Sequence, residues 1–181
     1  PEVYGSTVGL IKEDACYNPS TPYAVSHAAI DMSLKAFHKQ YDFPVMLARF
    51  ANFYGPGQQL YRIVPRSIMS ALGLDTMFLD GGGKSIRAFI HGQDVAYSIL
   101  AMLDKGMIGE TYHFSTGEFV SIKELVEKIA NLNGVSIDSF SQDGPDRPGK
   151  DAAYFMDCEK AKTELGWTPL ISLENGLQQS I

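Results

Sequence analysis

The sequence lacks the features that mark several broad classes of protein. Basic residues are not in excess, because 15 Lys and Arg stand against 21 Asp and Glu, for a formal net charge of −6. This balance excludes a sequence-wide attraction to nucleic acid or to anionic membranes. The two cysteines, Cys16 and Cys158, have no CxxC spacing, and the apolar runs are shorter than the roughly 18 residues of a membrane span. These absences predict a cytoplasmic protein with no nucleic-acid or membrane partner.

Three further absences concern the extent of the chain and its cofactors. The chain begins at Pro1 instead of Met, inside an expected strand end at residues 2–5, and no G-x-G-x-x-G motif follows an expected strand. We therefore interpret residues 1–181 as a single fragment from which an N-terminal dinucleotide-binding half is absent. His38, His91 and His113 have no metal-ligand spacing with the carboxylates, so no metal site is predicted.

A long helix is expected over residues 22–41. Thr21 is a favourable N-cap, and Pro22 is tolerated in the first turn, where its missing N–H costs nothing. Two apolar stripes follow at helical spacing, one made of Ile30, Leu34, Phe37 and Tyr41 and the other of Val25, Ala29, Met32 and Ala36. A helix that is apolar on nearly all sides contacts a partner as well as a core. We predict a homodimer through helix 22–41.

Strands and helices alternate through the rest of the chain. The continuous apolar run at 44–51 predicts a strand buried on both faces, and the turn residues at 52–57 end it. Ser121 and Glu124 form a capping box that begins another helix. Further strands are expected near 76–79, 86–90 and 110–114, and further helices at 62–73, 94–105, 157–165 and from Ser172.

This order of elements predicts an α/β fold in two parts. The C-terminal part of a doubly wound parallel sheet is expected at about 1–60 and 85–115. A small mixed α/β lobe that binds substrate is expected at about 61–84 and 116–181.

Tyr23 and His27 are the first candidates for chemistry. They lie four residues apart on the expected helix, so their side chains share one face. A tyrosine hydroxyl titrates near 10, and it accepts a proton at neutral pH only where a nearby cation stabilises its phenolate. Without its surroundings, the pair fits a buried tyrosine and a surface histidine better than a catalytic site.

The segment around this pair resembles a known motif. Tyr23-Ala24-Val25-Ser26-His27, preceded by Pro19-Ser20-Thr21-Pro22, is similar to the Tyr-x-x-x-Lys motif of extended short-chain dehydrogenases/reductases, the NAD-dependent epimerase/dehydratase family. The resemblance implies a Rossmann-like fold, NAD more than NADP as cofactor, Tyr23 as the base, and His27 in the place of the lysine that binds the nicotinamide ribose. A histidine side chain titrates near 6.5 and gives a phenolate less support at pH 7 than a lysine does.

Two more segments extend the resemblance. Pro1-Glu2-Val3-Tyr4-Gly5 is similar to the strand end that carries the family's carboxylate base. Glu2 would thus remove the C5 proton of a sugar once C4 is a ketone, although Pro1 stands where glucose dehydratases carry an Asp acid. The stretch at 49–56, RFANFYGP, is similar to the family's strand-to-loop signature. It implies that Asn52 contacts the substrate diphosphate and that the Phe50 backbone meets the nicotinamide amide.

Four residues in the second half of the chain stand in contexts similar to the family's substrate-binding segments. They are Arg62 in RIVP, Arg87 in SIRAFIH, Arg147 in DRPGKD, and Tyr154 a few residues later. Guanidinium groups match phosphate oxygens two at a time, so an acidic protein needs such a local cluster to hold a diphosphate. Taken singly, each arginine fits a solvated or salt-bridged surface residue better, and only the three together favour a phosphate site.

The likeness runs from Glu2 to the segment ELGWTP at 164–169, with the motifs in the family's order. It implies an NAD-dependent nucleotide-sugar 4,6-dehydratase or epimerase that transiently oxidises C4 of a nucleoside-diphosphate sugar, closest to the glucose dehydratase branch, with the isolated fragment inactive. One alternative is a nucleotide-sugar-binding module without turnover, which the histidine at position 27 favours. A dimerisation domain built on helix 22–41 is a weaker alternative.

Overall fold

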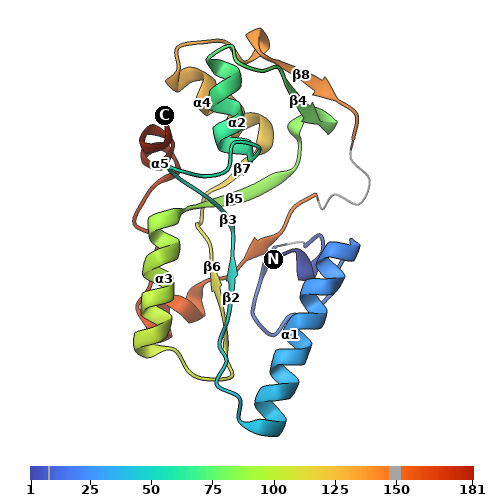
Figure 1. The fold of residues 1–181 in the computed structure, drawn as a ribbon, viewed down its shortest axis with the longest axis vertical. Helices are drawn as coiled ribbons and strands as arrows, with labels where there is room; N and C mark the ends of the chain where they lie inside the picture. The colour runs from blue at the N-terminus through green and yellow to red at the C-terminus, as the bar shows by residue number, and fades with distance from the viewer. Residues whose placement is uncertain (8, 147–151) are drawn as a thin grey trace.

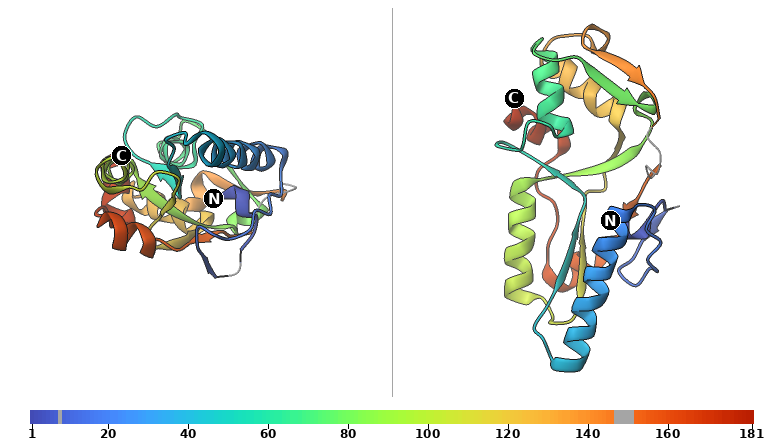
Figure 2. Two further views of the ribbon diagram at one scale, coloured as in Figure 1. Left: turned by 90° about the horizontal axis from the view of Figure 1, so that it is seen from below. Right: turned by 45° about the vertical axis from the view of Figure 1, so that its right-hand side comes forward.

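The computed structural model describes residues 1–7, 9–146 and 152–181, and these form an elongated molecule with two ends (Figure 1). At one end, the helices α1 (Pro22–Tyr41) and α3 (Gly92–Lys105) lie on either side of the strands β2 (Leu47–Phe50) and β6 (Thr111–Phe114), as both Figure 1 and Figure 2 show. We call this the α1 end. The other end, called the α4 end, holds α2 (Ile63–Ala71), α4 (Ile122–Leu132) and α5 (Leu173–Ser180).

Most strand pairs in the described chain are parallel. β2 pairs with β6, β3 (Asn52–Tyr54) with β5 (Ile86–His91), β4 (Met77–Asp80) with β8 (Ser141–Gly144), and β1 (Leu10–Ile11) with β9 (Phe155–Met156). β7 (Phe119–Ser121) is antiparallel to β5. Parallel strands need long crossovers, and each crossover here contains at least one helix. The α/β fold class predicted from the order of elements is confirmed.

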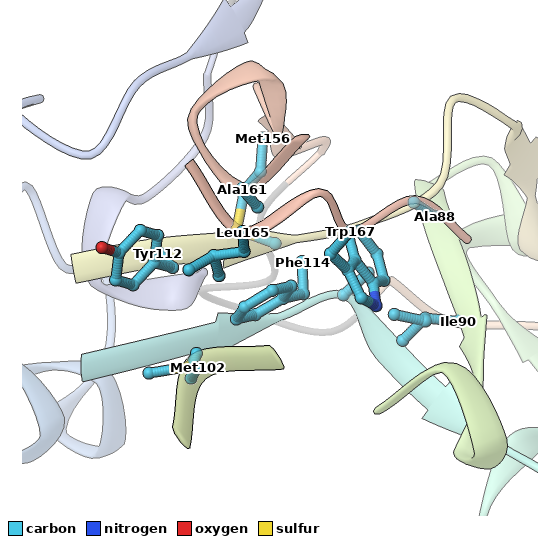
Figure 3. Packing of buried hydrophobic residues seen from close by; sticks show 10 residues of the cluster. Ala88, Ile90, Met102, Tyr112, Phe114, Met156, Ala161, Leu165 and Trp167 are labelled. Atoms are coloured by element: carbon cyan, nitrogen blue, oxygen red, sulfur yellow. The ribbon is translucent and has the colours of Figure 1, made fainter. Parts of the chain in front are cut away.

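The core of the α1 end is built on aromatic side chains from β2 and β6. Phe114 stacks on Phe50 with ring centroids 5.4 Å apart and meets the edge of Trp167 at 5.0 Å. Figure 3 shows Leu165 and Ala161, from the turn η4 (Ala161–Leu165), packed over β6, the strand that carries Phe114. Gly166 ends η4 in the left-handed conformation (φ 68°), which glycine adopts without steric cost.

A second core holds the α4 end together. The inner face of α4 buries Leu125, Val126, Ile129 and Ala130 against α2, β4 and β5. The predicted capping box begins this helix: the Ser121 hydroxyl accepts from the Glu124 N–H at 3.1 Å, and the Glu124 carboxylate accepts from the Ser121 N–H at 2.7 Å.

The long first helix has the predicted bounds but few buried residues. Thr21 caps it, with its hydroxyl accepting from the Ala24 N–H at 3.1 Å, and Pro22 is its first residue. Of its 20 residues only Ala24 and Ala28 are buried, so most of both predicted apolar stripes faces outward.

Two local predictions were wrong. Residues 2–4 form the short helical turn η1 (Glu2–Tyr4) instead of a strand end, because the N–H groups of Tyr4 and Gly5 donate back to Pro1 and Glu2. The strand expected at 44–51 covers only β2, and residues 52–54 continue as β3 instead of forming a turn. The Ala51 N–H still donates to Phe114 in β6 at 2.8 Å, and the next residue pairs with β5.

Candidate active site

A cleft of about 590 Å³ lies where η1, α1, β2, β3 and the beginning of α2 meet. Its lining includes seven residues that the sequence singled out: Glu2, Tyr23, His27, Phe50, Asn52, Arg62 and Tyr154. They come from five separate stretches of the chain, so their convergence is a property of the fold and not of any one motif.

Tyr23 and His27 form one wall of the cleft. Both side chains are exposed, Tyr23 at 63%, and their ring centroids are 4.4 Å apart with the planes tilted by 48°. The first turns of α1 produce this contact, since residues four apart stack along a helix face. An exposed phenol beside an exposed imidazole is available to a ligand and to a proton.

Glu2 also lines the cleft, from the turn η1. It is half-buried, and the buried residues that follow it, Val3 and Tyr4, anchor this turn against Ala28 of α1. The turn is therefore fastened next to the helix that carries Tyr23. A carboxylate and a phenol border the same space, which is the pairing needed to move two different protons.

Asn52 and Tyr154 are joined at the floor of the cleft. The Tyr154 hydroxyl donates to Asn52 Oδ1 at 3.1 Å. The Arg87 guanidinium lies over the other side of this tyrosine, 4.4 Å from its ring centroid, and donates to the carbonyl oxygens of Ile86 and Ala152. Among the described residues Arg87 does not itself line the cleft; it supports Tyr154, which does.

Arg62 stands at the beginning of α2, where it is the N-cap residue, and its guanidinium lies 5.2 Å from the ring centroid of Tyr61. Both side chains are exposed and line the cleft. A guanidinium at the start of a helix is a favourable place for an anion, because the free N–H groups there add to its charge. Arg147, the third predicted arginine, lies outside the described residues.

The structure adds two charged residues that the sequence reasoning missed. Arg49, only 6% exposed, donates through Nη2 to Asp31 Oδ2 at 2.6 Å, and both residues line the cleft. Burial alone would lower the pKa of Arg49, but the hydrogen bond with Asp31 and the nearby Tyr4 and Tyr17 raise it overall. An arginine inside the apolar run at 44–51 was a usable signal, because a buried charge needs a partner.

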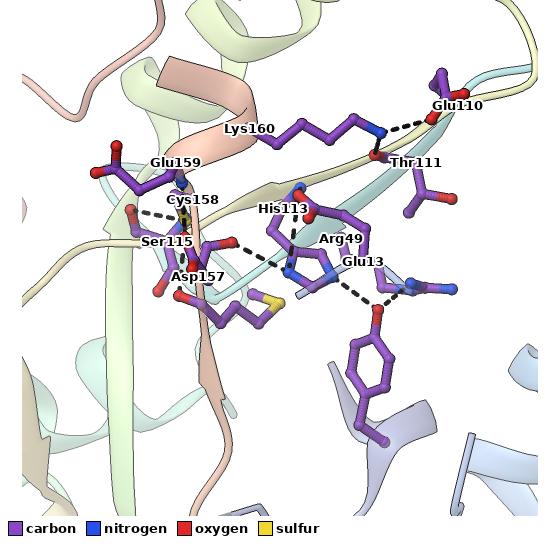
Figure 4. A network of polar contacts seen from close by, with 12 residues as sticks. Glu13, Arg49, Glu110, Thr111, His113, Ser115, Asp157, Cys158, Glu159 and Lys160 are labelled. Atoms are coloured by element: carbon purple, nitrogen blue, oxygen red, sulfur yellow. Dashed lines mark hydrogen bonds and ion pairs between the residues drawn. The ribbon is translucent and has the colours of Figure 1, made fainter. Parts of the chain in front are cut away.

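A chain of hydrogen bonds continues from Arg49 into the core of the α1 end (Figure 4). Arg49 donates to the Tyr4 hydroxyl, which lies 2.7 Å from Nε2 of His113. His113 Nδ1 is 3.2 Å from the Asp157 carbonyl oxygen. Burial and the charge of Arg49 lower the pKa of His113 to about 3, so this imidazole is neutral. It donates to Asp157 through Nδ1 and accepts from Tyr4 through Nε2.

The described residues contain no group of three or more His, Cys, Asp or Glu side chains placed to hold a metal ion. Within the same residues, no helix combines the length and the apolar character needed to cross a bilayer.

Comparison with known proteins places these features in a wider group. A family model described as GDP-mannose 4,6 dehydratase matches residues 1–180. The chain is 34% identical over 190 aligned residues to a dTDP-glucose 4,6-dehydratase of Xanthomonas campestris pv. campestris (strain ATCC 33913), covering 99% of this chain and 54% of that protein. It is 33% identical to the low-salt glycan biosynthesis protein Agl12 of Haloferax volcanii, covering 99% of this chain and 58% of that one.

Solved structures show the same relation. The chain is similar to DesIV, a dTDP-glucose 4,6-dehydratase of Streptomyces venezuelae with NAD and TYD bound, at a TM-score of 0.94 and 33% identity over 99% of this chain and 56% of that one. A UDP-glucuronic acid 4-epimerase of Bacillus cereus in complex with UDP-glucuronic acid and NAD gives a TM-score of 0.93 at 27% identity, over 99% and 57%. The chain spans little more than half the length of these relatives.

Proposed function

The chain belongs to the GDP-mannose 4,6 dehydratase family, and from this premise we propose that it forms the substrate-binding and proton-transferring part of an NAD-dependent nucleotide-sugar 4,6-dehydratase or epimerase. The observation that carries the proposal is the single cleft bordered by Tyr23, His27, Glu2, Asn52 and Arg62. Its lining combines a phenol and a carboxylate with a cationic and an amide group, which suits a sugar linked to a diphosphate.

The residues present fit the nicotinamide end of NAD. An exposed phenol and imidazole share one helix face, and the same cleft passes the end of β2 at Phe50. Tyr23, His27 and the Phe50 backbone would hold this end of the cofactor. When bound, NAD supplies the acceptor of the hydride from C4 of the sugar and its donor on the return step. The DesIV and epimerase structures both contain NAD.

Tyr23 and Glu2 divide the proton transfers between them. Tyr23, as its phenolate, accepts the proton of the C4 hydroxyl and becomes the phenol, and a positive charge on the His27 ring beside it would stabilise the phenolate before the transfer. Once C4 is a ketone, the C5 hydrogen is acidic and the Glu2 carboxylate removes it. Pro1 carries no acid to protonate a leaving hydroxyl at C6, which keeps epimerisation in the proposal beside dehydration.

The substrate diphosphate is proposed to lie between Arg62 and the Asn52–Tyr154 pair. Arg87 acts on the phosphates through Tyr154, whose ring it covers. Arg147 is also proposed to bind the substrate diphosphate. Charge-assisted hydrogen bonds from these groups would hold a dianion in an otherwise acidic protein.

The outward-facing apolar side chains of α1, among them Val25, Met32 and Phe37, support a homodimer through this helix.

The division into sheet elements (1–60 and 85–115) and a substrate lobe (61–84 and 116–181) is also part of the proposal, as is a cytoplasmic location.

Replacement of the phenol tests the proposal in the full-length protein. Tyr23→Phe removes the hydroxyl but keeps the ring on His27, so we expect kcat for nucleotide-sugar turnover to fall by about 10²–10⁴-fold with little change in nucleotide-sugar affinity. Tyr41→Phe removes an exposed hydroxyl at the other end of the same helix and should leave kcat unchanged. Equal activity of wild type and Tyr23→Phe would contradict the proposal.

A second candidate is a binding module without turnover, which the histidine at position 27 favours. A panel of dTDP-glucose, GDP-mannose and UDP-glucuronic acid separates the two functions. An enzyme changes the near-ultraviolet absorbance of its nicotinamide during turnover, whereas a module binds the nucleotide sugar with no such change.

His27→Lys should raise the turnover rate at pH 8, because a lysine stays protonated there.

A further inference from the structure

Arg49, which lines the cleft, connects three separate segments of the chain through one side chain. Its Nη2 atom donates to Asp31 of α1 at 2.6 Å and to the Tyr17 hydroxyl at 2.5 Å, and its Nη1 atom donates to the Tyr4 hydroxyl. The guanidinium also lies over the rings of Tyr4 and Tyr17, with its carbon 4.8 and 5.1 Å from their centroids. Both terminal nitrogens of the group therefore donate hydrogen bonds, and two aromatic rings lie against it.

Each partner of Arg49 is a near neighbour of a residue assigned to chemistry. Asp31 lies one helical turn after His27 and two turns after Tyr23, on the same face of α1. Tyr4 ends the turn η1, which begins at Glu2. Arg49 itself precedes Phe50 in β2. A shift of the guanidinium would thus move Tyr23, Glu2 and Phe50 relative to one another.

The helix α1 has few other attachments that could fix it. Only Ala24 and Ala28 of its residues are buried, and alanine methyl groups permit sliding and rotation more readily than interlocking larger side chains do. The Arg49–Asp31 pair is short and largely shielded, with side chains 5% and 18% exposed. A planar fork with fixed donor directions sets both the height and the rotation of the helix.

We propose that Arg49 is a positioning residue that sets the relative placement of the Tyr23–His27 face and the Glu2 turn, through Asp31 on one side and Tyr4 on the other. This inference rests on the function proposed above. Arg49 donates no proton to the substrate. It acts by holding α1 and η1 at the separation at which both protons can be taken from one bound sugar.

Arg49→Lys in the full-length protein tests the inference. Lysine keeps the positive charge beside Asp31 but cannot donate in three fixed directions, so the protein should fold while kcat falls by about 100-fold, the effect of a misplacement near 1 Å. The dissociation constant for UDP-glucuronic acid or dTDP-glucose should stay within about threefold, because Arg62 and Tyr154 are untouched. Arg66→Lys, in the exposed Arg66–Asp75 pair, is the matched control and should leave kcat unchanged.

Asp31→Asn tests the helix branch, and Tyr4→Phe tests the η1 branch. The double variant with Arg49→Lys and Asp31→Asn should be no slower than the slower single variant, since both changes release the same contact. Tyr4→Phe should slow exchange of the C5 hydrogen with solvent deuterium more than it slows oxidation at C4, because it frees Glu2 and leaves α1 attached.

Hydrogen–deuterium exchange supplies a readout that does not depend on turnover. In Arg49→Lys, amide exchange should accelerate in η1 and in the first turns of α1 but not in α4. A uniform acceleration across both ends, or a kcat within about threefold of wild type, would overturn the inference. If the wild type turns over no nucleotide sugar, the proposed function fails, and the exchange pattern still decides whether Arg49 positions the two segments.

Discussion

The helices α1 and α4 are fastened to the molecule in opposite ways. α4 buries a continuous stripe made of Leu125, Val126, Ile129 and Ala130, whereas α1, nearly twice as long, buries two alanines and is tied down by the Arg49–Asp31 pair. An apolar stripe requires one whole face of a helix to be covered. A polar contact at one point leaves the neighbouring turns uncovered, which suits the proposed role of α1 in presenting Tyr23 and His27 to a ligand.

The largest effect should come from breaking the apolar attachment. Ile129→Ala deletes a fully buried side chain at the junction of the two clusters of the α4 end, and the free energy of unfolding should fall by about 3–4 kcal/mol. Chemical denaturation measures this change. Ile129→Val is the control and should cost about 1 kcal/mol. Similar losses for both variants would show that the site collapses and that the stripe is not closely packed.

The polar attachment of α1 should break at a smaller cost. Arg49→Met leaves the Asp31 carboxylate without its charged partner, and because that carboxylate is 18% exposed and still accepts from the Tyr17 hydroxyl, the loss should be about 2 kcal/mol, below the range of about 3–5 kcal/mol for fully buried pairs. Arg66→Met, in the exposed pair, should change the free energy of unfolding by less than about 0.5 kcal/mol. Equal effects would mean that shielding of the Arg49–Asp31 pair contributes nothing.

The hydrogen-bond network that runs from Arg49 through Tyr4 to His113 should weaken in acid. The apolar packing of α4 should not. The pKa of buried His113 is lowered to about 3 in the folded protein, against about 6.5 when unfolded, so its contribution is present above pH 6.5 and is lost as the pH falls toward 3. The expected slope is up to about 1.4 kcal/mol per pH unit in that window. Denaturation at several pH values should show the slope in wild type and a flatter line in His113→Gln. A slope that persists in this variant would assign the acid sensitivity to other groups.

The smallest difference should separate the two helix caps. Thr21→Ala and Ser121→Ala each remove a hydroxyl that accepts from a first-turn N–H, and each should cost about 1 kcal/mol of stability. Only Thr21→Ala should also lower kcat, because Tyr23 lies in the turn that Thr21 caps. Parallel melting and turnover measurements on the two variants check this, and an equal loss of kcat would contradict the comparison.

Local rules predicted the helices well. The caps at Thr21 and Ser121 act within a few residues, so their signals are complete in a short stretch of sequence. The strand β8, with the sequence SQDG, had no alternating apolar signal, because its pairing depends on β4 alongside it. Strand assignments therefore failed where a neighbour distant in the chain decides them.

The site was predictable only in part, for the same reason. Tyr23 and His27 could be paired from their spacing, and the other site residues from their motifs. The network around Arg49 could not, since Arg49 and Asp31 are 18 residues apart and Tyr4 and His113 are 109 apart. Contacts of this length leave no periodic pattern. The buried arginine in an apolar strand indicated only that some partner had to exist.

The strand that crosses the middle of the molecule exchanges neighbours at Ala51, leaving β6 and joining β5. Phe50 and Asn52, on either side of this crossover, both border the cleft. A ligand that touches both residues would connect the α1 end to the α4 end. Occupancy should then raise the melting temperature of the whole molecule, because the ligand contacts the strands of both ends.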